Sequence, residues 1–307
     1  MTDPRLSVVV LSWNTREILR ACLVALQRDG YPAPREVVVV DNASHDGSAD
    51  MVAAEFTWVR LVRNATNLLF AEGNNQGARL ASGEYLCLMN SDIEVRPGAL
   101  LALEEFLASH PDYGAVVPKL LNPDGSVQRA CARFPGLLDP LFQSTFLGRF
   151  PPGTWVKLYR NMVDFDHQRS RDVEQPPAAC FMMRRQEYLA VGGFDPVLGL
   201  FFNDVDLCRR LWRAGRRIRY LAEAEALHRR GSSTRASGLT GDLHWYRNRT
   251  AYYRKHYGPL AARWVRAVGR MWSFEYRLRI RFGPRDAQAR RVALDELREF
   301  MRQCESP

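Results

Sequence analysis

Residues 7–12 read SVVVLS, a continuous apolar and β-branched run near the start of the chain. A run without polar alternation is typical of a strand that is covered on both faces, as the strands of parallel sheets are. Residues 36–40 (EVVVV) and 84–89 (EYLCLM) repeat the pattern. A shorter strand is expected over 59–62, and helical spacing of apolar residues stands between the runs, over about 18–26, 49–56, 74–80 and 97–108. This alternation predicts an α/β domain with an open, mostly parallel sheet flanked by helices.

Polar side chains follow two of these strands at the point where each strand ends. Asp41 follows the second strand, and Asn90-Ser91-Asp92 follows the fourth. Open parallel sheets bind ligands at the carboxyl ends of their strands, so we expect a binding site at this edge. Two interpretations of Asp41 are open. It caps the following helix, or it accepts a hydrogen bond from a base or ribose, with Asn42 and Asp46 helping to shape the pocket.

Asp92 and His228 are candidates for binding a cation. A carboxylate that ends an apolar strand is costly unless it is solvated, hydrogen-bonded or bound to a cation. A divalent cation that bridges Asp92 to a diphosphate would supply that partner. His228 follows a predicted strand over 220–227, where a histidine is either structural or a ligand.

Two predicted helices begin with polar residues. Asn14 is expected to cap the first helix, because Glu17 stands three residues later as in a capping box. Residues 201–210 (FFNDVDLCRR) lead into a helix expected over 204–214. Its acidic first turn either interacts with the helix dipole or provides Asp204 as a general base for an acceptor hydroxyl.

The pattern changes after residue 115. A strand over 115–118 and a turn over 122–125 predict a hairpin whose second strand lies within 126–133. Residues 135–177 contain six prolines, so we expect an irregular, substrate-facing excursion there. A strand follows over 178–183, and the chain from His244 onward is predicted to be helical.

The positive charge is concentrated in the last third of the chain. Residues 207–307 hold 24 Arg or Lys against 9 Asp or Glu, whereas residues 1–206 hold 19 against 25. This region also carries many Trp and Tyr residues among its arginines. It either contacts an anionic partner, such as a membrane surface or a pyrophosphate-linked substrate, or is a solvated helical appendage that packs on the core or forms a homodimer.

Composition and motifs argue against several other classes. Six scattered cysteines without a C-x-x-C pair indicate neither a disulfide framework nor a zinc site, which fits a cytoplasmic protein. The short apolar run at the start is unlike a signal peptide, and no apolar run of about 18 residues predicts a membrane span. A dinucleotide-dependent oxidoreductase is disfavoured because no G-x-G-x-x-G follows the first strand. Nucleic acid is not an expected partner, because no recognised motif accompanies the basic charge.

Seven motifs carry a family resemblance that spans roughly residues 5–235. They lie at 7–14, 41–48, 67–77, 90–92, 192–195, 201–210 and 228–232. Their order resembles that of the family 2 glycosyltransferases, and in detail the chain is similar to the rhamnosyltransferase-like branch. The resemblance implies a GT-A fold. It divides the chain into a catalytic domain over 1–240, with a nucleotide-binding half over 1–115 and an acceptor half over 116–240, and a basic, aromatic-rich helical extension over 241–307.

The resemblance also implies roles for individual residues. Asp41 would contact the nucleobase, Asp92 would be the metal-binding acid, His228 an additional metal ligand, and Asp204 the catalytic base. Further contacts to the nucleotide-sugar donor are expected from Ser12, Asn14, Asn42, Asp46, Asn67, Asn74, Asn90 and Ser91. The expected cation is Mg²⁺ or Mn²⁺, and a dTDP-sugar is favoured over a UDP-sugar. Such enzymes invert the anomeric centre in a single displacement.

Two residues depart from the family pattern. Asn203 stands where glutamate usually precedes the base, which keeps hydrogen bonding but removes a charge. Leu69 stands where glycine usually lets the backbone approach the donor closely. The consequences of both for rate and donor preference are open.

The sequence therefore predicts an inverting glycosyltransferase of cell-surface polysaccharide synthesis. The expected sugar is a deoxysugar such as rhamnose, and the expected acceptor is a saccharide or lipid-linked saccharide. Peripheral contact with an anionic membrane at the cytoplasmic face of the inner membrane is expected as well. The alternative is a non-catalytic saccharide-binding or scaffold protein with the same fold, for which Asn203 is the only indication.

Overall fold

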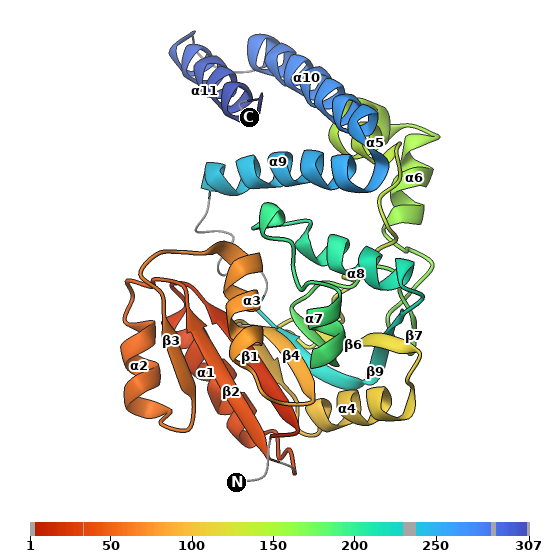
Figure 1. The fold of residues 1–307 in the computed structure, drawn as a ribbon. Helices are drawn as coiled ribbons and strands as arrows, with labels where there is room; N and C mark the ends of the chain where they lie inside the picture. Colours follow the sequence, from red (N-terminus) through yellow and green to blue (C-terminus); the bar gives the residue numbers. More distant parts are fainter. Residues whose placement is uncertain (1–3, 33, 230–237, 284–286, 306–307) are drawn as a thin grey trace. The chain divides into compact units, whose positions relative to one another are not determined.

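The computed structural model divides the chain into two compact units (Figure 1). The sheet unit comprises residues 1–132 and 165–237, and the helical unit comprises residues 133–164 and 238–307. The residues that the structure describes are 4–32, 34–229, 238–283 and 287–305. The functional division at residues 115 and 240 stays a prediction.

The first half of the sheet is parallel, as predicted. Strand β1 (Leu6–Ser12) lies between β2 (Arg35–Asp41) and β4 (Tyr85–Asn90), and β3 (Arg60–Arg63) lies beyond β2. Val8, Val9 and Val10 are fully buried, which confirms that β1 is covered on both faces. Ser12 pairs with Asp41 and Leu11 with Asn90, so the polar residues that follow β2 and β4 meet at one edge.

The second half mixes strand directions. The order of the main sheet is β3-β2-β1-β4-β8-β6-β9-β5, and β7 (Arg171–Asp172) pairs with β9. Strand β8 (Cys180–Arg184) is antiparallel to β4 and to β6 (Tyr113–Leu121), whereas β6 is parallel to β9 (Arg217–His228). Strand β5 (Ile93–Val95), which the sequence did not predict, is antiparallel to β9. Since β1, β2, β3, β4, β6 and β9 share one direction, the prediction of a mostly parallel sheet is confirmed.

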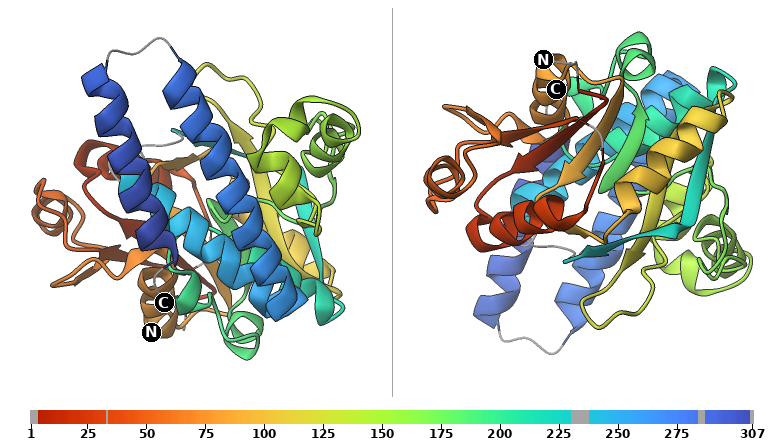
Figure 2. Two further views of the ribbon diagram at one scale, coloured as in Figure 1. Left: turned by 90° about the horizontal axis from the view of Figure 1, so that it is seen from above. Right: turned by 90° about the horizontal axis from the view of Figure 1, so that it is seen from below.

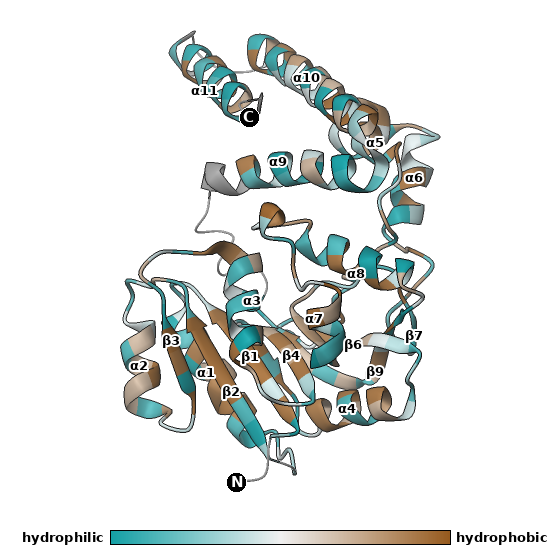
Figure 3. Cartoon of the chain, in the orientation of Figure 1, coloured by the Kyte–Doolittle hydropathy of each residue, from teal (hydrophilic) through white to brown (hydrophobic). Residues whose placement is uncertain are grey.

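Helices cover both faces of the sheet (Figure 2). Helix α1 (Arg16–Arg28) and helix α4 (Ala99–Ser109) pack on the face that carries Val8 and Val10. Helix α3 (Leu69–Leu80) packs on the opposite face through glycines, and a Cβ on Gly77 would lie only 2.3 Å from Val9 Cγ1. Helices α2 (Ser48–Glu55), α7 (Arg185–Ala190) and α8 (Asn203–Arg213), with the 3₁₀ turn η2 (Pro196–Leu198), complete the described helical segments of this unit. Figure 3 shows the hydrophobic strands that these helices cover.

Three local predictions were wrong. Helix α3 begins at Leu69, five residues earlier than expected. Residues 126–133 form no second hairpin strand, because only an isolated bridge joins Leu121 to Val127 among the hairpin residues described. Residues 135–177 are not uniformly irregular, since they include α5 (Asp139–Ser144), η1 (Phe146–Arg149) and α6 (Gly153–Arg160). Prolines stand at the starts of α5 and α6 instead of breaking them: Pro140 lies in the first turn of α5, and Pro152 is the N-cap of α6. Neither position needs a backbone N–H for the helix.

The helical unit is built from α9 (Gly238–Tyr257), α10 (Pro259–Phe282) and α11 (Ala287–Glu305), which confirms the predicted helical C-terminal region. Residues 133–164 pack onto these helices. Tyr253 Oη donates to Gly136 O at 2.7 Å, and Trp264 Nε1 donates to Leu137 O at 2.9 Å. In the part of the chain that the structure describes, no helix combines the length and apolarity that crossing a bilayer requires.

Candidate functional site

The ends of β1 and β4 are joined by a chain of hydroxyl groups. Ser12 Oγ lies 3.0 Å from Thr15 Oγ1, which lies 2.9 Å from Ser91 Oγ. All three residues are buried. Ser12 and Ser91, predicted as donor contacts, therefore lie together, and the link between them, Thr15, was not identified from the sequence.

Asn14 and Asp46 hold the two loops at the sheet edge against each other. Asn14 adopts a φ of 52°, its N–H donates to Ser44 Oγ, and its Oδ1 accepts from His45 N at 2.8 Å. Asn14 does not cap α1, which begins with Thr15 as N-cap and has no side-chain cap. Asp46 instead accepts from Arg16 N at 2.8 Å and from Ser48 N at 3.0 Å. Burial acts to raise the pKa of Asp46, but these hydrogen bonds outweigh it and lower the pKa.

Asp41 is a buried carboxylate, and only one of its two oxygens accepts a hydrogen bond in the described residues. Its Oδ2 accepts from Ser44 N at 3.0 Å, and the residue is 3% exposed. Its Oδ1 is buried and has no hydrogen-bond partner in the described residues. The helix-cap interpretation is wrong, because Gly47 is the N-cap of α2 and no side chain caps that helix. Leaving a buried acceptor unsatisfied costs about 1–3 kcal/mol, so Asp41 Oδ1 is suited to an external donor.

Asn42 fixes the loop that leads into α3. Its Nδ2 donates to Asn67 Oδ1 at 3.0 Å and to Leu69 O at 3.1 Å, and its Oδ1 accepts from Leu68 N at 3.1 Å. Asn67 Oδ1 also accepts from Leu69 N at 2.8 Å. The structure thus brings Asn42 and Asn67 together, with the loop itself as their partner. Asn74, within α3, is buried and donates to Phe70 O at 2.9 Å.

Leu69 adopts a backbone conformation that glycine accommodates most easily. Its φ is 62°, in the left-handed region, where a side chain costs about 1–2 kcal/mol. The Leu69 side chain packs closely against Gly199, where a Cβ would lie 2.7 Å from Leu69 Cδ1. Ala71 N also donates to Gly199 O at 2.9 Å. The loop before α8 therefore lies against the first turn of α3.

Asp92 and His228 face each other across the β5–β9 pair. Asp92 Oδ1 lies 3.5 Å from His228 Nε2, and the strand register pairs Ile93 with His228. Asp92 is 6% exposed, and burial raises the pKa of its carboxyl group to about 6. Asp92 Oδ1 has no hydrogen-bond partner in the described chain. Asn90, at the end of β4, is half-buried, and its N–H donates to Ala179 O.

Gln128 fixes the protonation of the His228 ring. Gln128 Nε2 donates to the His228 carbonyl at 2.8 Å, which leaves Oε1 to face His228 Nδ1 at 2.9 Å. Because Oε1 can only accept, Nδ1 carries the proton, and in the neutral ring Nε2 presents a lone pair toward Asp92. Two acceptors at this distance repel each other unless a proton or cation lies between them. Gln128 was not predicted, since it lies in the segment assigned to a hairpin strand.

Asp204 lies at the start of α8, after two strained residues. Phe201 and Phe202 have φ values of 67° and 60°, a conformation that bulky side chains rarely adopt outside functional sites. Asp204 is half-buried, and its Oδ1 accepts from Val205 N at 2.8 Å. Asn203 is buried, its Oδ1 accepts from Asp204 N, and its Nδ2 has no partner in the described structure. The loop contact between Gly199 and α3 brings the start of α8 toward the edge that carries Asn42. The catalytic role of Asp204 stays a prediction.

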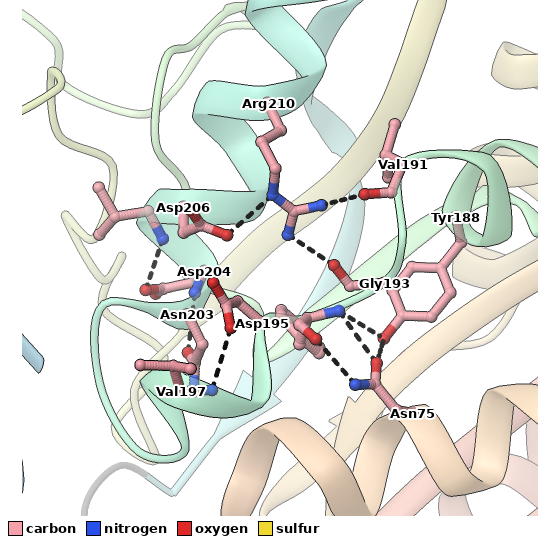
Figure 4. Close-up of polar contacts among 12 residues, drawn as sticks. Asn75, Tyr188, Val191, Gly193, Asp195, Val197, Asn203, Asp204, Asp206 and Arg210 are labelled. Carbon is pink, nitrogen blue, oxygen red and sulfur yellow. Dashed lines mark hydrogen bonds and ion pairs between the residues drawn. The ribbon is translucent and has the colours of Figure 1, made fainter. Parts of the chain in front are cut away.

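The glycine motif at 192–195 is held by polar side chains (Figure 4). Arg210 pairs with Asp206 at 2.8 Å and donates to the carbonyls of Val191 and Gly193. Asn75 donates to Phe194 O at 2.8 Å and accepts from Phe194 N at 2.9 Å. These contacts position the segment that precedes α8, and sequence reasoning missed them because their partners lie far apart in the chain.

A cation at this edge would have two protein ligands. Asp92 Oδ1 and His228 Nε2 are an oxygen and a nitrogen ligand with a fixed orientation, and both suit Mn²⁺ or Mg²⁺ with oxygens from a diphosphate and water. Within the described chain, no group of three or more His, Cys, Asp or Glu side chains could hold a metal ion. The residues thus fit a cation that is shared with a ligand, not a closed metal site.

Comparison with solved structures identifies the fold. The mannosyltransferase PcManGT from Pyrobaculum calidifontis, in complex with GDP-Man and Mn²⁺, aligns with a TM-score of 0.54 at 16% identity and covers 99% of this chain and 86% of its own. GalNAc-T7 with UDP, GalNAc and Mn²⁺ aligns with a TM-score of 0.55 at 14% identity, over 82% of this chain and half the length of that one. The class that the fold defines is therefore GT-A.

Sequence comparison gives the family. An N-acetylglucosaminyl-diphospho-decaprenol L-rhamnosyltransferase of Mycobacterium tuberculosis is 29% identical over 249 residues, covering 76% of this chain and 78% of that protein. The O-antigen biosynthesis protein RfbC of Myxococcus xanthus is 29% identical over 83% of this chain and 20% of its own length. The sequence model of Glycosyl transferase family 2 matches residues 7–188, more than half of the chain. The protein belongs to this family and is a glycosyltransferase.

Proposed function

We propose that the protein is a metal-dependent, inverting transferase that moves a deoxysugar such as rhamnose from a nucleotide-diphosphate donor to a hydroxyl of a lipid-linked saccharide. The Mycobacterium tuberculosis relative supports the choice of sugar and acceptor through its name. The observation that carries the proposal is the facing pair of Asp92 Oδ1 and His228 Nε2 at 3.5 Å.

This pair would hold Mg²⁺ or Mn²⁺ together with the donor diphosphate. The cation would supply neutralisation of the charge that grows on the leaving diphosphate. The protein's own contribution is orientation: Gln128 faces Nδ1 of His228, which directs Nε2 of the ring toward Asp92. Burial keeps water from competing for Asp92.

Asp41 and Asp204 take the other two roles. Asp41 Oδ1 is a buried acceptor without a described partner, which suits the N–H of a pyrimidine base such as that of a dTDP- or UDP-sugar. Asp204 accepts the proton of the acceptor hydroxyl as its oxygen attacks the anomeric carbon. The hydroxyl oxygen forms the new glycosidic bond, and the nucleoside diphosphate leaves with the electron pair of the broken bond.

A donor-hydrolysis screen tests donor and metal together. Purified protein is incubated with dTDP-rhamnose, UDP-sugars and GDP-sugars, with Mn²⁺ or with EDTA, and release of nucleoside diphosphate is measured. We expect the strongest signal with dTDP-rhamnose and its loss in EDTA. Metal-independent turnover would contradict the role of the Asp92–His228 pair, and preference for another donor would overturn the choice of rhamnose.

The non-catalytic alternative is favoured by one observation, the buried Asn203 with an unsatisfied Nδ2 beside the predicted base. Asp204→Asn separates the two functions. For an enzyme, we expect donor binding within twofold of wild type and a loss of transfer of about 10²–10⁴-fold. Wild-type protein that binds donor and acceptor but transfers with no donor in the screen would establish the scaffold function instead.

Peripheral contact with an anionic membrane is supported by a basic surface of the helical unit. Arg270, Arg277, Arg298, Arg302 and Phe274 line a concavity of about 440 Å³ on α10 and α11. Phe274 is 60% exposed, and arginines beside an exposed aromatic ring suit a headgroup layer. Sedimentation with anionic vesicles, but not with neutral ones, is expected, and the double variant Arg270→Glu with Arg277→Glu should weaken that sedimentation.

A homodimer through the helical unit is the competing prediction, and sedimentation equilibrium without lipid tests it.

A further inference from the structure

The helical unit contains a cavity of about 450 Å³ that is lined by none of the candidate site residues described above. Helices α9, α10 and α11 line it together with the end of α5. Its volume is in the range of small-molecule sites in proteins. Most of its wall is aromatic or apolar, and the side chains that form this wall are Trp245, Tyr246, Trp272, Tyr276, Leu297 and Phe300.

Arg249 places a buried positive charge in the lining of this cavity. The residue is only 3% exposed, and its guanidinium lies 4.4 Å from the centroid of the Trp245 ring. Nη1 donates to Ser144 Oγ at 2.6 Å, whereas Nε is buried without a hydrogen-bond partner in the described residues. Desolvation lowers the pKa of Arg249 to about 10, so the group is still charged at neutral pH.

No carboxylate neutralises this charge in the part of the chain that the structure describes. The contacts of Arg249 are a hydroxyl group and two aromatic rings. Asp242 and Glu296 also line the cavity, but both residues are exposed, so solvent screens their charge. A buried cation without a counter-charge is costly to fold, and an anionic ligand would remove that cost.

We propose that this cavity binds the phosphate-bearing end of a prenyl-type lipid, with the phosphate on Arg249 and the first apolar units against the aromatic wall. The choice of phosphate rests on the proposed lipid-linked acceptor, since the cavity itself requires only an oxyanion on an apolar body. Phosphate oxygens match the donors of a guanidinium, and Ser144 Oγ offers a further polar contact. The aromatic wall accounts for the apolar part of the ligand.

Binding of farnesyl monophosphate to the full-length protein tests the site. Calorimetric titration is done in EDTA, so that no cation can hold a phosphate group at the donor site. Farnesol, inorganic phosphate and laurate are titrated in parallel. We expect farnesyl monophosphate to bind at least tenfold more tightly than each of them. Farnesol binding as tightly as farnesyl monophosphate would overturn the role of Arg249. Inorganic phosphate binding as tightly would overturn the role of the aromatic wall. Laurate binding more tightly than farnesyl monophosphate would overturn the choice of phosphate and assign a carboxylate lipid instead.

Two variants and one matched control assign the binding to this cavity. Arg249→Met should weaken farnesyl monophosphate at least tenfold, whereas Arg266→Met, which removes an exposed arginine of α10, should change it less than twofold. Trp245→Ala keeps the charge and removes a wall residue that is 38% exposed, and it should weaken binding at least threefold. Circular dichroism checks that each variant is folded. If Arg249→Met does not fold, the binding of farnesyl monophosphate to Trp245→Ala tests the proposal instead. Equal losses in Arg249→Met and Arg266→Met, or none in Trp245→Ala, overturn the proposal.

The outcomes separate this site from the proposed function. Arg249-dependent lipid binding by a protein that transfers no sugar would retain the cavity site and overturn the transfer. Transfer to a lipid-linked saccharide with an unchanged acceptor KM in Arg249→Met would retain the transfer and overturn the cavity site.

Discussion

Each of the two units buries a charged side chain beside a candidate ligand site, Asp92 in the sheet unit and Arg249 in the helical unit, and the two charges have opposite sign. In the sheet unit, the buried Asp92 carboxylate places Oδ1 3.5 Å from His228 Nε2. In the helical unit, Arg249 is a cation that contacts a hydroxyl and aromatic rings. Burial raises the pKa of Asp92 to about 6 and lowers that of Arg249 to about 10. Burial of either charged group opposes folding. Both groups are therefore explained better by ligands that carry the opposite charge.

Removing the anion should separate activity from stability. Asp92→Asn is expected to lower donor turnover by about 10³-fold, because one cation ligand is lost. In EDTA its free energy of unfolding should rise by about 1 kcal/mol, because a neutral amide is cheaper to bury than an unpaired carboxylate. Initial rates and urea unfolding measure the two effects.

The control for this variant is Asp112→Asn, which removes an exposed carboxylate of the same unit. It should leave both turnover and stability near wild type. An Asp92→Asn protein that is strongly destabilised would mean that the carboxylate serves the fold, and the comparison between the two units would fail.

Buried charges that do have partners should behave in the opposite way. Arg35 pairs with Asp29 at 3.3 Å, and the Asp29 side chain is fully buried. Arg35→Met removes the ion-pair partner of the buried Asp29 carboxylate and should lower the free energy of unfolding by about 3 kcal/mol. Arg249→Met removes no partner from a carboxylate and should lower the free energy of unfolding by less than about 1 kcal/mol. Urea unfolding of both variants decides, and similar losses would show that Arg249 is a structural residue.

Gln128 should affect metal use more than the chemical step. Gln128→Leu releases His228 Nδ1 and lets the ring change its tautomer, so the apparent Mn²⁺ requirement should rise about 10–100-fold. The maximal rate at saturating Mn²⁺ should change less than the metal requirement. Gln27→Leu, at an exposed position of α1, is the matched control. A loss of maximal rate with an unchanged metal requirement would argue against Gln128 as a positioning residue.

The sequence predicted the anionic site far better than the cationic one. Asp92 follows the apolar strand β4 and His228 ends β9, and strand ends of this kind are recognisable from local pattern alone. Gln128 was missed because its contact with His228 spans 100 residues, and its own segment was assigned to a hairpin. Arg249 was missed because it is one of many arginines in helical segments, and its contact with Ser144 joins residues 105 positions apart in the chain. Local pattern thus identified single residues, whereas contacts between distant segments determined their environment.

Leu69 gives the smallest effect, at the loop between β3 and α3. Its left-handed φ of 62° penalises any side chain, so Leu69→Gly should relieve about 1 kcal/mol of strain but lose the packing against Gly199. Leu69→Ala loses most of the packing and keeps the strain. We therefore expect the glycine variant to be more stable than the alanine variant by about 1 kcal/mol, which is the reverse of the order within a helix. Urea unfolding checks the order. An alanine variant at least as stable as the glycine variant would mean that residue 69 follows ordinary helix preference and that its left-handed φ carries no cost.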